Sequence, residues 1–223
     1  MHNLKFKKNY QKFDSQRLNN IPEVISKEFS RIQLDQKIKP GMKIAITAGS
    51  RGIDNIQVIL KAIIEEVKKR NASPFIVTAM GSHGGATAEG QKKMLSSYGI
   101  TEKNMGVSIE ATMDTVQLDQ LENGLPVYFD KITCNANGII IVNRVKVHTA
   151  FKAEIESGLH KMLSVGLGNH QGAKLIHSLG VQGIRDYMVE FAKVILKKAP
   201  ILAGFGILEN AYDQTLKIVA ARP

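Results

Sequence analysis

A guanidinium and two imidazoles, groups that hold anions and move protons, stand after short apolar runs of the sequence. They are Arg51, His83 and His148, and the runs are residues 42–48, 74–80 and 138–143. Each run has the length and composition of a buried strand. The carboxyl ends of parallel strands face one crevice, where ligands usually bind in open α/β sheets. We therefore expect the three side chains to converge on one cleft.

The sharpest local motif is Gly-Ser-His-Gly-Gly at residues 81–85. Its glycines let the backbone approach a ligand closely and leave the His83 imidazole unshielded. The amide groups at the start of the following helix would also hold an anion. The alternative is a tight turn whose histidine faces solvent. We favour the functional interpretation.

Residues 143–148 alternate polar and apolar side chains. If the strand continues, Arg144, Lys146 and His148 share one of its faces. Two neighbouring cations would lower the pKa of the imidazole and favour the neutral form that a proton acceptor requires. A solvated basic face on an edge strand is an equal alternative on these residues alone.

The loop at residues 49–52, Gly-Ser-Arg-Gly, would present Arg51 to a carboxylate or a phosphate. An exposed loop arginine is the alternative interpretation. Neither a P-loop nor a Gly-x-Gly-x-x-Gly fingerprint follows the first strand, which argues against ordinary ATP or NAD binding.

Three more histidines, His160, His170 and His177, lie in a glycine-containing region. Imidazoles suit a borderline metal such as nickel or zinc, but these spacings match no standard zinc pattern. We interpret Glu154 and Glu156 as surface charges rather than as an acid and base pair.

Strand, loop and helix follow each other twice in the first half of the chain, which predicts parallel strands with right-handed crossovers. We expect a three-layer, Rossmann-like α/β domain with a mostly parallel sheet and a β-rich insertion at about 107–129. Residues 1–40 form an N-terminal arm and a helix of the same domain, and 41–223 form its catalytic and cofactor-binding part. Asp54 is expected to cap the helix that ends near Arg70.

The 223 residues carry a formal net charge of +10. The basic residues are dispersed, apart from a small cluster at Lys5, Lys7, Lys8 and Lys12. This pattern favours a small anionic ligand over nucleic acid. The one cysteine, Cys134, fits a reducing compartment, and no run is long and apolar enough for a membrane span, so we expect a soluble cytoplasmic protein.

As an ordered set, these residues resemble the N-terminal domain of the nickel-dependent lactate racemase family. That family has an arginine after the first strand, a Gly-Thr/Ser-His motif after the second, another histidine, a lysine and a final histidine. The matching positions here are Arg51, His83, His148, Lys161 and His177. The resemblance spans about residues 40–180.

The resemblance implies a racemase or epimerase of a 2-hydroxy acid that works by proton-coupled hydride transfer with a nickel pincer nucleotide, pyridinium-3,5-bisthiocarboxylic acid mononucleotide nickel. By similarity, His83 and His148 are the catalytic pair, Lys161 the cofactor tether and His177 the nickel ligand. The other implied contacts are Arg51, Ser82 and Gly84 for the cofactor, and Arg51 and Arg144 for the substrate.

The implied partners are a small hydroxy acid and the cofactor-biosynthesis proteins, with no nucleic acid and no membrane. Family members carry a second domain, which we expect this chain to lack. Gly84 and Gly85 stand where lactate racemases have Arg-Pro, so the resemblance does not assign lactate as the substrate. The alternative is a non-catalytic binding domain for a phosphorylated small molecule or nucleotide.

Overall fold

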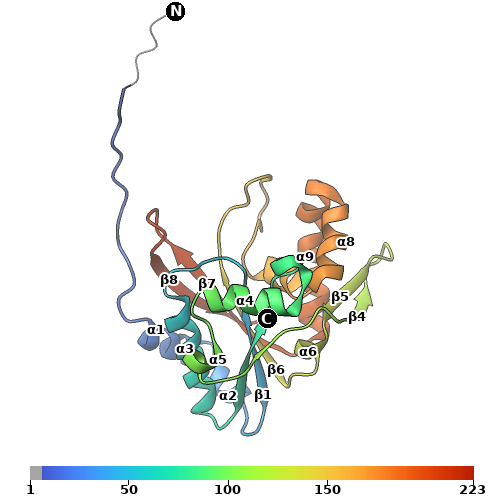
Figure 1. Cartoon of the computed structure of the whole chain (residues 1–223), viewed down its shortest axis with the longest axis horizontal. Helices are drawn as coiled ribbons and strands as arrows, with labels where there is room; N and C mark the ends of the chain where they lie inside the picture. Colours follow the sequence, from blue (N-terminus) through green and yellow to red (C-terminus); the bar gives the residue numbers. More distant parts are fainter. Residues whose placement is uncertain (1–6) are drawn as a thin grey trace, which may run out of the picture.

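The structure, a computed structural model, describes residues 7–223. Its centre is a sheet whose six strands have the order β3-β2-β1-β6-β7-β8 (Figure 1). All neighbours pair in parallel except β7 and β8. The strands are β1 Lys43–Ala48, β2 Ser73–Thr78, β3 Ile109–Glu110, β6 Gly138–Arg144, β7 Ile201–Glu209 and β8 Thr215–Ala221. The predicted α/β class with a mostly parallel sheet is confirmed.

The order of the strands places three loops side by side. Strand β1 lies between β2 and β6 and runs parallel to both. Its final residue, Ala48, pairs with Thr78 at the end of β2. The segments that follow β1, β2 and β6 therefore leave the sheet at the same edge, as the sequence predicts.

Helices cover both faces of the sheet and make three layers (Figure 1). Alternation along the strands supplies two cores, with Ile46 and Ile76 in one and Ala45 and Val77 in the other. The first face carries α1 Ile21–Arg31, α2 Leu34–Lys37, α3 Ile56–Lys68, α4 Ala88–Ser97 and α5 Glu102–Met105. The second carries α6 Lys131–Cys134, α7 Leu159–Lys161, α8 Asn169–Ser178 and α9 Gly180–Lys198.

The described part of the N-terminal segment is an irregular stretch followed by helices α1 and α2. Residues 7–20 have no regular structure, and Lys5 of the basic cluster lies outside the described residues. Asn20 caps α1 by accepting the backbone N–H of Glu23, and Ile25 and Phe29 bury the apolar face of the helix. None of the helices in residues 7–223 is long and apolar enough to cross a bilayer.

The β-rich insertion is a hairpin of β4 Thr115–Gln120 and β5 Pro126–Asp130 that packs on the second face. The Asp130 carboxylate lies buried at its end and accepts the Thr133 N–H at 2.7 Å and the Asn169 Nδ2 at 2.8 Å. Burial raises the pKa of Asp130 despite these hydrogen bonds. The contact fixes the hairpin to the start of α8.

The prediction that Asp54 caps α3 is wrong. Asn55, in the left-handed conformation, precedes the helix and makes no side-chain cap. The Asp54 carboxylate instead accepts the Thr215 backbone N–H at 2.8 Å. The carboxylate therefore binds a residue 161 positions away in the sequence, and this hydrogen bond connects the loop after β1 to β8.

Candidate active site

A cleft of about 430 Å³ opens at the carboxyl ends of β1, β2 and β6. Among the sequence-predicted residues, seven line it: Arg51, Ser82, His83, Arg144, His148, Lys161 and His177. Gly84 is not part of the lining. Among residues 7–223, no aspartate or glutamate lines the cleft, whereas Lys146 adds another cation. A lining of basic side chains without carboxylates suits an anion.

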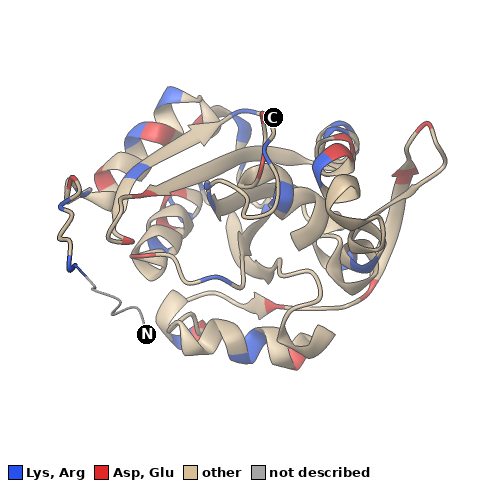
Figure 2. Ribbon diagram, turned by 90° about the horizontal axis from the view of Figure 1, so that it is seen from above, with Lys and Arg blue, Asp and Glu red and all other residues tan. Residues whose placement is uncertain are grey.

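Elsewhere on the molecule the charges are mixed. Acidic and basic segments alternate along the helices around the sheet (Figure 2), and many pair within one helix, such as Lys27 with Glu23 and Lys193 with Glu190. In the cleft, Arg51, Lys146 and Lys161 form no ion pair among residues 7–223. These three basic side chains are therefore available to an anion.

A tight turn after β2 presents His83. Gly84 has φ +66°, and a Cβ atom there would lie 2.7 Å from the backbone nitrogen of Gln91. Only glycine fits that position without a shift of α4. The Gln91 side chain, buried below the turn, donates to the Gly81 carbonyl at 3.0 Å. The histidine is thus held on a rigid turn, although its ring is exposed to the cleft.

Ser50, a residue that the sequence did not single out, contacts the His83 ring. Its Oγ lies 2.5 Å from His83 Nδ1, and its carbonyl accepts the Tyr98 hydroxyl at 2.8 Å. Because Nδ1 is engaged, Nε2 is the nitrogen left to exchange a proton with a ligand. Partial burial, followed by Arg51, Lys161 and His177, lowers the pKa of His83, so the neutral ring is favoured.

His148 lies on a loop, not on a strand. The predicted continuation of β6 through residues 145–148 is wrong, because the strand ends at Arg144. The last ladder contact is the Val145 N–H to the Ile207 carbonyl at 2.8 Å. We call residues 145–157 the His148 loop. Its residues 146–149 line the cleft although they share no strand face.

The guanidinium of Arg144 is less available to a ligand in the cleft, because it already has a partner. Its guanidinium forms an ion pair with Glu209, whose side chain is 6% exposed. The other Glu209 oxygen accepts the Asp54 backbone N–H at 2.8 Å. Arg144 therefore lines the cleft with its charge already balanced. Arg51, which has no such partner among the described residues, is the guanidinium more available to an anion.

The ring of His148 has contacts at one face and at both nitrogens. It stacks on Phe151 with ring centroids 4.1 Å apart, and its Nδ1 accepts the Ala150 N–H at 3.2 Å. Its Nε2 lies 3.4 Å from the Lys161 amine. Burial, Lys161 and Lys146 lower the pKa of His148, and Glu156 opposes them. The neutral ring is again favoured, because the lowering causes prevail.

Lys161 is a half-buried amine of the site. It ends α7 and leads into a π-helical turn over Met162–Gly166, a distortion often found at functional sites. Burial lowers its pKa, and the cations Lys146 and Arg51 lower it further. A lowered pKa makes this amine easier to deprotonate than a solvated lysine, which suits a nucleophile.

The three remaining histidines do not form a cluster. His177, in the last turn of α8, lines the cleft, whereas His160 and His170 do not. Burial and Lys193 lower the pKa of His160, which places that ring near α9. Within residues 7–223 no group of three or more His, Cys, Asp and Glu side chains could hold a metal ion by itself. A metal at this site would need ligands from elsewhere in addition to His177.

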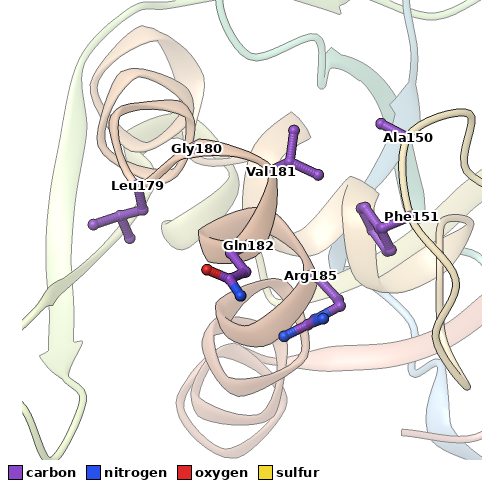
Figure 3. A pocket seen from close by; sticks show the side chains of 7 residues that line it. All are labelled: Ala150, Phe151, Leu179, Gly180, Val181, Gln182 and Arg185. Atoms are coloured by element: carbon purple, nitrogen blue, oxygen red, sulfur yellow. The ribbon is translucent and has the colours of Figure 1, made fainter.

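A second hollow of about 490 Å³ adjoins the His148 loop on its other side. Figure 3 shows Ala150 and Phe151 of the loop opposite Val181 and Arg185 at the start of α9. Arg185 is already paired with its neighbour Asp186. Among the described residues that line this hollow there is no group of reactive side chains, in contrast to the first cleft.

These features define a class of protein: a three-layer α/β domain with a cationic cleft that contains imidazoles and an amine at the carboxyl edge of its sheet. A sequence model described as lactate racemase N-terminal domain matches residues 4–183, and the chain belongs to this family. No curated protein matched the chain.

The solved structure of the lactate racemase apoprotein from Thermoanaerobacterium thermosaccharolyticum has a similar fold. The TM-score is 0.69 at 14% sequence identity, over 93% of this chain and 53% of that one. The chain thus spans about half the length of that racemase. At this identity the match concerns the fold, and the chemistry must be argued from the residues themselves.

Proposed function

We propose that this chain is the cofactor- and substrate-binding domain of a racemase or epimerase that acts on a 2-hydroxy acid. The observation that supports it most is that His83 and His148, 65 positions apart in the sequence, line one cleft with neutral rings favoured at both. Inversion of a carbinol centre needs a group that takes the hydroxyl proton and a group that returns it. Membership of the lactate racemase family agrees with this reaction class.

The residues of the cleft fit a nickel pincer nucleotide. Such a group brings its own sulfur ligands, so His177 would supply the one further metal ligand, and no protein metal cluster among residues 7–223 is required. The lowered pKa of Lys161 suits an amine that would form a covalent tether, and Arg51 and the turn at Ser82 suit the phosphate. When bound, the group would accept a hydride from the substrate carbon and give it back.

The side chains of this chain would perform the proton steps. Neutral His83, with its ring proton on Nδ1 toward Ser50, would take the proton from the substrate hydroxyl at Nε2. His148 would do the same from the other side at Nε2 in the tautomer that carries its proton on Nδ1, and this requires it to give up the Ala150 N–H. The imidazolium that forms lies among cations, which favours the return of its proton when the carbinol is restored. Arg51 binds the substrate carboxylate and keeps the carbon between the two rings.

A non-catalytic binding domain for a phosphorylated small molecule or nucleotide is the second candidate. It is favoured by one feature, the cationic lining without any carboxylate, which suits a phosphate regardless of chemistry. This candidate does not require the two imidazoles or a lysine with a lowered pKa.

Coexpression with the cofactor-biosynthesis proteins separates the two candidates. The chain should then carry about one nickel per molecule and a visible absorbance band, and it should interconvert the enantiomers of at least one 2-hydroxy acid in a chiral assay. His83→Ala and His148→Ala should each abolish interconversion, whereas the metal and the band should remain. If the chain binds mononucleotides but retains no nickel, the result would support the second candidate, a non-catalytic binding domain.

A further inference from the structure

We propose that Glu156 is a positioning residue for His148, which holds the His148 loop folded so that the imidazole lies in the cleft. The role as a base rests on the proposed function, whereas the positioning itself is a property of the chain. Glu156 lies at the surface, as predicted, but both of its carboxylate oxygens accept hydrogen bonds from the backbone of the loop.

Both carboxylate oxygens of Glu156 are used inside the loop. Oε2 accepts the His148 backbone N–H at 2.7 Å, and Oε1 accepts the Ala153 N–H at 3.2 Å. These hydrogen bonds lower the pKa of Glu156, so the carboxylate stays ionised and the hydrogen bonds are charge-assisted. One side chain therefore joins three points of a segment that has no secondary structure.

Other contacts hold the two ends of the loop together, so the contacts of Glu156 hold its middle. Asn143 Nδ2 donates to the Gly158 carbonyl at 2.8 Å, and Gly158, at φ +82°, lies against Val145. Between these ends the segment has left the sheet, and Lys146 and Val147 are exposed. The His148 backbone is fixed from inside the loop by Glu156, and the ring is then oriented by Ala150 and by stacking on Phe151.

Glu156 also affects the charge balance at His148. The groups that act on the ring are Lys161 from α7 and Lys146 and Glu156 from the loop. Both lysines lower the pKa of His148, and Glu156 raises it. Loss of the Glu156 carboxylate should therefore lower the pKa of His148 further. Glu156→Gln, which neutralises the side chain, and Glu156→Ala, which truncates it, should shift this pKa in the same direction.

The test is an NMR titration of the 223-residue chain without cofactor, in which the His148 ring and the backbone amides are followed. Glu156→Gln removes the charge and one of the two acceptor oxygens, because the amide nitrogen cannot accept. Glu154→Gln is the matched control. It removes an equal charge two positions away, from an exposed side chain that makes no side-chain hydrogen bond with the described residues.

In Glu156→Gln we expect the apparent pKa of His148 to fall and its amide to exchange about tenfold faster, the change expected when a charge-assisted hydrogen bond is lost. Glu154→Gln should leave the pKa and the amide exchange of His148 unchanged. The His83 ring should titrate alike in the wild type, Glu156→Gln and Glu154→Gln, and this would show that the fold is intact. Glu156→Ala should repeat the Gln effects with faster exchange at Ala153 as well.

Unchanged titration and exchange in Glu156→Gln and Glu156→Ala would overturn the proposal, whatever the protein catalyses. If these signals change but the cofactor-loaded protein interconverts no hydroxy acid, the positioning holds and the proposed function fails. In an active loaded protein, Glu156→Gln should lower kcat about tenfold with little change in KM and move the acidic limb of the pH profile to lower pH.

Discussion

Two neighbouring glycines after His83 allow a quantitative test of how the turn is built. Gly84 and Gly85 have nearly equal backbone angles, φ +66° and +67°, but different surroundings. A Cβ at Gly84 would lie 2.7 Å from the Gln91 nitrogen and 2.8 Å from the Gly90 carbonyl carbon, whereas nothing lies within 4 Å of one at Gly85. The pair therefore separates the cost of the left-handed conformation from the cost of crowding.

Gly85→Ala should cost only the conformational strain of an alanine in this region, about 1–2 kcal/mol. Gly84→Ala should add the cost of pushing backbone aside, about 1–3 kcal/mol, for a total of about 2–5 kcal/mol. Urea unfolding followed by circular dichroism measures both values, and the difference between the variants is the crowding cost alone.

The two variants should also differ at the site. In Gly84→Ala the turn must move away from α4, so the contact between Ser50 Oγ and His83 Nδ1 is weakened and the His83 ring shifts. NMR chemical shifts of that ring should change in Gly84→Ala and stay close to wild type in Gly85→Ala. Equal destabilisation by the two substitutions would refute the argument that close backbone approach explains Gly84.

Three further outcomes follow from the buried and half-buried charges. Lys146→Met should raise the pKa of Lys161 and slow its acylation by an amine reagent near pH 8, measured by peptide mass spectrometry, because one of the cations that lower that pKa is removed. Burial raises the pKa of Asp130, so the folded protein binds this proton more tightly than the unfolded chain, and the resulting stabilisation is lost as pH rises above about 4. Asp130→Asn should flatten that part of the profile of melting temperature against pH. Glu209→Gln should lower the free energy of unfolding by about 1–3 kcal/mol, because the Arg144 cation loses its partner, and a melting temperature equal to wild type would contradict this.

The sequence predicted the sheet and the position of its reactive edge. Apolar runs at β1, β2 and β6 are each followed by glycine-rich or polar turns, and this local pattern is enough to identify strands. Arg51 and His83 stand within five residues of their strands, so the chain has little freedom to place them elsewhere. Their convergence follows from parallel pairing alone.

Long-range contacts decided what the sequence did not predict. β6 ends at Arg144, and the guanidinium there pairs with Glu209, a residue of β7 that no local pattern connects with it. Residues 159–166 fold into α7 and a π-helical turn, which no local pattern of the sequence predicts. Gly166 is needed there for packing, since a Cβ would lie 2.9 Å from the Ala79 carbonyl oxygen.

The two imidazoles of the cleft are therefore positioned by different means. His83 stands on a turn braced by α4, which should change little when a ligand arrives. His148 stands on a loop whose middle is held by Glu156 and whose outer side borders an open hollow next to α9. A loop held by a few exposed hydrogen bonds opens at lower free energy than a packed turn. If one wall of the cleft moves to admit a cofactor or a substrate, it should be the wall that contains His148, and hydrogen exchange should be faster at residues 146–153 than at 81–87.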